Sequence, residues 1–92
     1  MPDLTLGPVI ITKYCPATNR RNSHILATHK RDSETTWRRY HDYDQGISSE
    51  DNHLAAAEKL LSFWPYHHWQ KKLRIVARGH DEKGYYFVCS LP

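Results

Sequence analysis

Two neighbouring arginines in a short polar segment carry the most distinctive chemistry of this 92-residue chain. Arg20 and Arg21 lie between Asn19 and Ser23, among residue types that are typical of turns. Guanidinium groups, backbone amides and short hydroxyl or amide side chains are the groups that bind phosphates. The segment is therefore a candidate site for phosphate or for an acidic protein. The alternative is a solvated hairpin in which Asn19 and Ser23 bond to the local backbone.

Three further cations extend this candidate site if the segments that carry them are strands of one sheet. Lys13 lies in a β-branched and aromatic segment before the turn, and Arg38 and Arg39 lie in a similar segment after it. On neighbouring strands, we expect Lys13, Arg38 and Arg39 to form one basic strip with the two arginines of the turn.

A second candidate site combines aromatic rings with cations in the connector of residues 64–72 and at the start of the segment that follows. Its members that could contact a partner are His67, His68, Trp69, Lys71, Lys72 and Arg74. Rings interleaved with cations suit base stacking and contact with a nucleic-acid backbone, and they suit the hot spot of a protein interface equally well. The alternative is that Trp64 and Trp69 cover the open end of the hydrophobic core.

Seven histidines raise the question of a metal site, and His67 and His68 are adjacent. Adjacent side chains point to opposite sides of an extended chain and lie about 100° apart on a helix. No cysteine pair or carboxylate stands at ligand spacing nearby, so we predict no metal ion. No glycine-rich phosphate loop is present either, and we predict no cofactor.

A catalytic reading of the chain rests mainly on His41 and Asp42, which are adjacent. A general base also needs a nucleophile and a pocket, and neither Cys15 nor Cys89 lies in a papain-like context. The sequence therefore favours a protein that is not an enzyme. We expect His53, at the start of a helix, to bond a backbone carbonyl or a neighbouring strand or loop.

The charges of the chain are arranged in blocks. Residues 1–40 carry seven lysines and arginines against three acids, residues 41–58 carry five acids and neither lysine nor arginine, and residues 59–80 carry five lysines and arginines and no acid. Such blocks indicate a polarised surface and a charged partner. The alternative is that they serve solubility alone.

Residue patterns predict five strands and one helix. The expected strands are residues 9–14, 24–29, 35–40, 73–78 and 85–89, and the first three form an antiparallel meander. The helix runs from about Glu50 to Phe63, with Ser48 or Ser49 as N-cap and an apolar stripe that includes Leu54, Ala57 and Leu61. The last strand is apolar on both faces, which indicates an interior position. In the strand before it, Leu73, Ile75 and Ala77 are expected on one face.

The predicted architecture is a single α+β domain over residues 1–92: an antiparallel sheet of about five strands, in the order β-β-β-α-β-β, with one helix packed on one face. No apolar run approaches the roughly 20 residues of a membrane span, and no signal peptide is visible. We therefore expect a cytoplasmic protein without a membrane partner. Two cysteines fit two free thiols in a reducing compartment.

Several short blocks together resemble a family of small phage- and plasmid-encoded proteins of unknown function. They are Ile11-Thr12-Lys13-Tyr14 with Pro16-Ala17-Thr18-Asn19-Arg20-Arg21 and Ser23, then Tyr40-His41-Asp42-Tyr43, Glu50-Asp51-Asn52-His53 and Gly84-Tyr85-Tyr86-Phe87-Val88. The blocks span most of the chain in the family's order, although Arg21 and Asn22 depart from its usual loop. The resemblance implies a mobile-element origin, a compact α+β fold, no established enzyme activity and the cytoplasm of a host cell.

Three functions follow as expectations. The first is an accessory protein that binds and inhibits a host protein or ribonucleoprotein defence complex, such as a CRISPR surveillance complex. The second is a direct nucleic-acid-binding protein of phage replication or recombination. The third is a structural or assembly protein, either a monomer or a homodimer that associates through an exposed sheet edge or through Trp69.

Overall fold

A computed structural model describes residues 7–30, 33–62 and 74–90 of the chain. Within them the elements are β1 (Val9–Cys15), β2 (His24–Lys30), β3 (Thr36–Asp42), α1 (Ser49–Ser62), β4 (Arg74–Asp81) and β5 (Gly84–Ser90). The predicted order of five strands and one helix is confirmed, and each boundary lies within three residues of the one expected.

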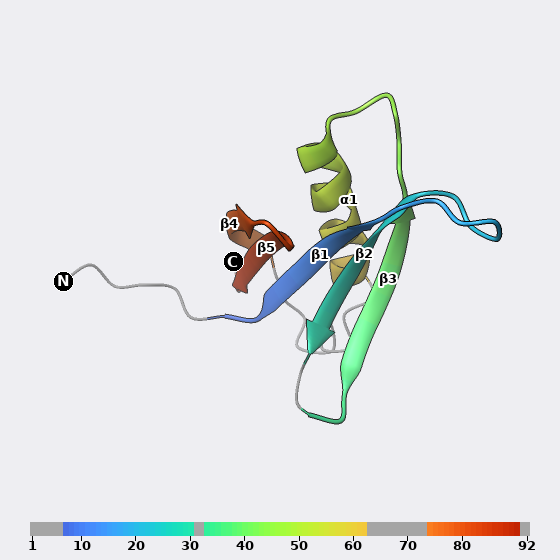
Figure 1. The fold of residues 1–92 in the computed structure, drawn as a ribbon. Coiled ribbons are helices and arrows are strands. Elements are labelled where there is room, and N and C mark those ends of the chain that lie inside the picture. The colour runs from blue at the N-terminus through green and yellow to red at the C-terminus, as the bar shows by residue number, and fades with distance from the viewer. Residues whose placement is uncertain (1–6, 31–32, 63–73, 91–92) are drawn as a thin grey trace.

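The five strands form one open sheet in the order β3-β2-β1-β5-β4, and every neighbouring pair is antiparallel. The first three strands form the expected meander. β5 lies between β1 and β4, so its predicted interior position is confirmed. The sheet twists strongly: β1, β2 and β3 run along the page in Figure 1, whereas β5 and β4 are seen nearly end-on.

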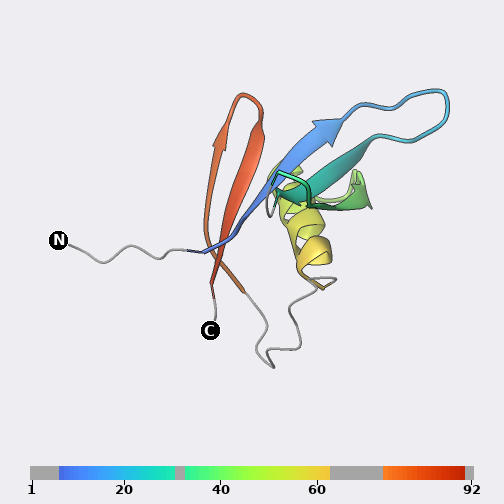
Figure 2. The same ribbon diagram turned by 90° about the horizontal axis from the view of Figure 1, so that it is seen from below.

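The helix begins where the sequence places an N-cap, because the Oγ atom of Ser48 accepts a hydrogen bond from the backbone N–H of Asp51 at 3.1 Å. Glu50 and Asp51 lie in the first turn and Lys59 in the last, the order that the helix dipole favours. α1 packs against β1, β2 and β3. Figure 2 shows it on one side of these strands, with the β4–β5 hairpin standing beside it.

Alternation along the strands separates a covered face from an open face. The core residues on the covered face and on α1 are Ile10, Ile25, Ala27, Phe87, Cys89, Ala56, Ala57 and Leu60. Both cysteines are free thiols, and burial raises the pKa of Cys89 to about 11. Side chains two residues apart share a face of a strand, so Lys13, Arg38 and Tyr40 belong to the face opposite the helix.

The expectation for β4 is wrong in one respect, because the register shifts between Ile75 and Ala77. Ile75 pairs with the buried Cys89, whereas Ala77 pairs with Val88 of the open face. The extra residue of a β-bulge reverses the alternation, so Ile75 and Ala77 lie on opposite faces and Arg78 shares the covered face with Ile75.

The connection between the last two strands is shorter than the predicted strands 73–78 and 85–89 imply, since β4 continues to Asp81 and β5 begins at Gly84. A Cβ atom on Gly84 would collide with the backbone carbonyl of Thr12 on β1. Glycine at this position therefore permits β5 to approach β1.

Candidate functional site

The open face of the sheet brings three of the predicted cations together around one tyrosine. In the pairing of β1, β2 and β3, Lys13 lies opposite Leu26, and Leu26 lies opposite Tyr40. Strands are about 4.8 Å apart, so Lys13 stands about 10 Å from the Tyr40 backbone. Arg38 precedes Tyr40 by two residues on the same face of β3. We call Lys13, Arg21, Arg38 and Tyr40 the Tyr40 cluster.

Arg21 joins this cluster from the loop between β1 and β2. Its guanidinium carbon lies over the Tyr40 ring, 3.9 Å from the ring centroid. Backbone hydrogen bonds between Thr18 and Arg21, of 2.8 and 3.4 Å, close the turn that carries it. A cation over the face of an aromatic ring at the protein surface gains about 0.5–1 kcal/mol, so this contact favours the position of the Arg21 side chain over Tyr40.

Tyr40 is also contacted by the ring of His24. The His24 ring meets it edge-on, with ring centroids 5.2 Å apart. His24 is buried, and its Nδ1–H donates to the carbonyl of Asn22 at 3.0 Å. Although 37% of Tyr40 is exposed, His24 and Arg21 together restrict its ring.

No carboxylate neutralises the cations of the Tyr40 cluster within the part of the chain that the structure describes. The one ion pair between two described residues joins Arg78 to Glu50 at 3.6 Å, on the covered side of the sheet. Asp42, on the open face, lies two residues beyond Tyr40. At the far end of the face, the hydroxyl of Tyr86 donates to Asp81 at 2.8 Å and lowers the pKa of that carboxyl group.

Apolar side chains surround the cations on the same face. Val9 and Ile11 of β1 are 37% and 43% exposed, and Leu26, Tyr86 and Val88 are partly buried. An exposed patch of this kind, with charged residues among its members, marks an interaction surface in soluble proteins. The open face thus offers apolar contact area and positive charge to one partner.

The other predicted site residues lie elsewhere. Asn19 and Arg20 are exposed in the β1–β2 loop, which projects beyond the rest of the sheet (Figure 1). Arg39 pairs with the buried Ala27 and faces the covered side, so it does not extend the basic strip. Arg74 lies on β4, at the opposite edge of the sheet from β3. The remaining predicted residues lie outside the described residues: His67, His68, Trp69, Lys71 and Lys72.

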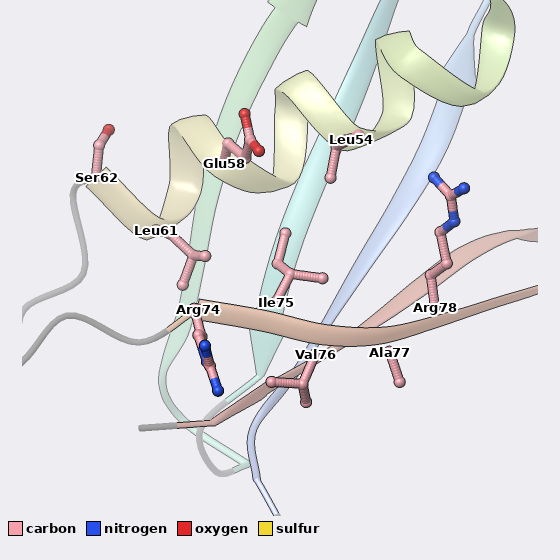
Figure 3. Close-up of a pocket in the computed structure, with 9 residues that line it drawn as sticks. All are labelled: Leu54, Glu58, Leu61, Ser62, Arg74, Ile75, Val76, Ala77 and Arg78. Carbon is pink, nitrogen blue, oxygen red and sulfur yellow. The ribbon is translucent and has the colours of Figure 1, made fainter. Parts of the chain in front are cut away.

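A groove of about 680 Å³ lies between α1 and β4, on the covered side (Figure 3). Leu54 and Leu61 of α1 and Ile75 of β4 point into it, and Arg78 stands at one end. The twist of the sheet carries β4 away from the helix and leaves this space. Residues 63–73, which follow α1 and precede β4, lie outside the described residues, and we assign no ligand to the groove.

Beneath the covered face, the buried Asn52 ties α1 to the loop that precedes it. Its side-chain oxygen accepts from the backbone N–H of Asp44 at 2.8 Å and from Nε2 of His41 at 3.1 Å. Its amide nitrogen donates to the carbonyls of Asp44 and Ser48 at 3.0 and 2.9 Å. This one side chain therefore satisfies polar groups on β3, the loop and the helix.

The next residue, His53, bonds to a residue of a strand. The sequence led us to expect a backbone carbonyl or a neighbouring strand or loop as its partner. Its Nδ1 atom lies 2.7 Å from Oγ1 of Thr12 on β1, and both residues are buried. Its ring lies against that of Tyr85, with centroids 4.2 Å apart. Burial lowers the pKa of His53 below its usual 6.5, so the ring is neutral at pH 7.

The lowered pKa of His53 predicts a pH-dependent stability. The unfolded chain takes up the proton more readily than the folded one, so the free energy of unfolding falls as the pH drops below 6.5 and levels off below the folded pKa. Urea unfolding of the wild type and of His53→Gln, which keeps a polar group near Thr12, measures this contribution at pH 7 and pH 5. We expect the wild type to lose more stability than the variant between the two pH values, and equal losses would contradict the prediction.

His41 and Asp42 do not form a catalytic pair. They are consecutive on β3, so their side chains point to opposite faces of the sheet, and His41 is hydrogen-bonded to Asn52. Within the described ranges, no group of three or more histidine, cysteine or acidic side chains is placed to hold a metal ion.

Sequence reasoning missed the roles of Tyr40, Thr12 and Asn52. For Asn52 and His53 a signal was present, because each precedes a buried alanine of α1 by four residues, at positions 56 and 57. This spacing places two polar side chains on the apolar stripe. The role of Tyr40 depends on the pairing of β2 with β3 and on the shape of the loop, for which the sequence carries no comparable signal.

The helix of the described residues is neither long enough nor apolar enough to cross a membrane. In comparisons with known proteins, no family model matches the chain, and neither a curated protein nor a solved structure is found to be similar to it.

Proposed function

We propose that this chain is a non-enzymatic protein that binds an anionic surface of a host nucleoprotein complex through the open face of its sheet and thereby blocks that complex. The observation that carries the proposal is the Tyr40 cluster. Arg21 is held over Tyr40 at 3.9 Å, and Lys13 and Arg38 lie on the same face without a carboxylate partner among the described residues. A cation that is held in place, as Arg21 is by Tyr40, loses less entropy on binding than a free side chain does.

Binding is favoured over catalysis by the state of the histidines. His53 is buried against Thr12, His41 bonds to Asn52, and His24 bonds to the carbonyl of Asn22. A general base must reach the proton that it abstracts. These three rings are instead engaged in packing and in hydrogen bonds that hold the fold.

The resemblance to small phage- and plasmid-encoded proteins supplies the biological setting of the proposal. A mobile element in a host cytoplasm gains from an inhibitor of nucleoprotein defence complexes, of which a CRISPR surveillance complex is one kind. A second candidate function is a direct nucleic-acid-binding accessory of phage replication or recombination. It is favoured by one specific observation, the guanidinium plane that Arg21 presents on Tyr40.

Affinity capture from a host lysate tests the proposal when a matched pair of variants is used. Arg21→Gln with Arg38→Gln removes two cations from the Tyr40 cluster. Lys59→Gln with Arg78→Gln removes two from α1 and the covered face, with the same change in net charge. We expect the wild type and the control pair to retain one nucleoprotein complex and the Arg21/Arg38 pair to lose it.

The purified complex then gives the functional readout. We expect its binding to its own nucleic-acid target to be inhibited by the wild type and by the control pair, and not by the Arg21/Arg38 pair. Inhibition that survives in the Arg21/Arg38 pair would show that the open face is not the blocking surface.

A further inference from the structure

We infer that the anionic partner of the open face is a single-stranded nucleic acid, one base of which stacks on the guanidinium of Arg21 where it lies on Tyr40. The inference rests on the proposed function and names the class of ligand at the same surface. It begins from the geometry of the contact between Arg21 and Tyr40, in which the guanidinium carbon lies over the ring, 3.9 Å from its centroid.

The stack is built in layers from the protein outward. The buried His24 supports the Tyr40 ring from one direction, with ring centroids 5.2 Å apart. Arg21 covers the ring from another, and it is an exposed residue of the loop. A guanidinium group is planar, is weakly hydrated and stacks on aromatic faces. Its outer face is therefore a second stacking surface, and unstacked nucleic-acid bases pack on such arginine planes.

Two cations of the open face lie near the stack and complement the phosphates of a nucleic-acid backbone. Arg38 lies two residues from Tyr40 along β3, about 7 Å away, and Lys13 lies two strands away, about 10 Å. A strand that crosses β3 toward β1 places phosphates near each cation and carries its bases over Leu26 and Ile11. Leu26 and Ile11 belong to the apolar part of the same face.

A single-stranded nucleic acid fits this surface better than a duplex or an acidic protein surface does. The bases of a duplex are already stacked and present no free face to Arg21. An acidic protein surface would pair with the edges of the guanidinium groups and would leave the outer face of Arg21 unused. The surface offers three features: a stacking plane, cations and apolar side chains. Only a strand with unpaired bases contacts all three.

The test replaces the plane while it keeps the charge. Arg21→Lys retains a cation but removes the planar group, and Arg78→Lys makes the same change at an arginine of the covered face. The probes are a labelled oligothymidine of about 15 nucleotides, a duplex of the same length, and heparin, which is a polyanion without bases. Fluorescence anisotropy of the full chain gives each dissociation constant, directly or by competition.

We expect Arg21→Lys to weaken oligothymidine binding about tenfold, the effect of one lost stacking contact, and to leave heparin binding within about twofold. Arg78→Lys is expected to change neither by more than about twofold. Tyr40→Leu is expected to weaken oligothymidine binding by at least as much as Arg21→Lys. Tyr14→Leu, at an exposed tyrosine that alternates to the covered face, is expected to bind as the wild type does.

Equal affinities of Arg21→Lys and the wild type for oligothymidine would overturn the inference, as would tighter binding of the duplex than of the single strand. The proposed function fails separately. If the wild type ignores oligothymidine while the Arg21/Arg38 glutamine pair still loses the captured complex, the open face binds an acidic protein surface and only the inference is wrong. If that pair keeps the complex, the proposed function is wrong.

Discussion

Replacement of Asn52 by alanine is expected to lower the free energy of unfolding by about 3 kcal/mol, the largest effect on stability that we predict. The side chain is fully buried and bonds to the N–H and carbonyl of Asp44, the carbonyl of Ser48 and the ring of His41. A buried polar group left without its partner costs about 1–3 kcal/mol, and the loop between β3 and α1 can rehydrate only some of these groups.

Urea unfolding followed by circular dichroism measures this loss. For a domain of this size it corresponds to a fall in Tm of roughly 10–20 °C. Asn22→Ala is the matched control, because that side chain is exposed and the bond to His24 uses only the backbone carbonyl of Asn22. We expect the control to stay within about 0.5 kcal/mol of the wild type. A similar result for Asn52→Ala would show that its hydrogen bonds are not needed for stability.

Neutralisation of Arg21 and Arg38 is expected to weaken binding to a polyanion about 100-fold, the largest effect on binding that we predict. The estimate assigns about 1.4 kcal/mol, or a factor of ten, to each cation. The salt dependence changes as well. If Lys13, Arg21 and Arg38 each meet one phosphate of a single strand, the logarithm of the association constant falls with the logarithm of salt with a slope of about −2, and the glutamine pair flattens it to about −0.7.

Isothermal titration calorimetry with a single-stranded oligothymidine at several salt concentrations measures both quantities. Lys59→Gln with Arg78→Gln separates local geometry from net charge, because it removes the same number of cations from the +3 chain. We expect this control pair to bind within about threefold of the wild type at a salt concentration near the physiological one, where charges more than about 8 Å apart are largely screened. A loss as large as that of the Arg21/Arg38 pair would attribute binding to overall charge.

Most of the fold follows from local patterns in the sequence. The β-branched and aromatic residues from Val9 to Tyr14 predict a strand, and β1 spans Val9–Cys15. Ser48 before two acids predicts the start of α1, and it supplies the N-cap. The apolar character of β5 on both faces predicts its interior position. In each case the residues that carry the signal are close together in the chain.

What the sequence does not predict depends on contacts between distant residues. The bulge at Val76 changes which side chains of β4 face α1, and nothing in the local pattern marks it. The Tyr40 cluster requires the pairing of Lys13 with Leu26 and of Leu26 with Tyr40. It also requires a turn that returns Arg21 to the sheet, while the neighbouring Arg20 stays in the projecting loop. The sequence therefore predicted the three cations of the cluster. It predicted neither the Tyr40 ring between them nor the position of Arg39 on the covered face.

Residue-resolved mapping of the bound polyanion tests the central claim most directly. Proton–nitrogen correlation spectra of the full chain, titrated with heparin, report which backbone amides sense the partner. The Tyr40 cluster predicts that the largest shifts occur at Lys13, Arg21, Arg38 and Tyr40, with small shifts along α1. Shifts concentrated at Lys59 of α1 or at Arg78 of β4, on the covered side, would contradict the assignment of the open face as the binding surface.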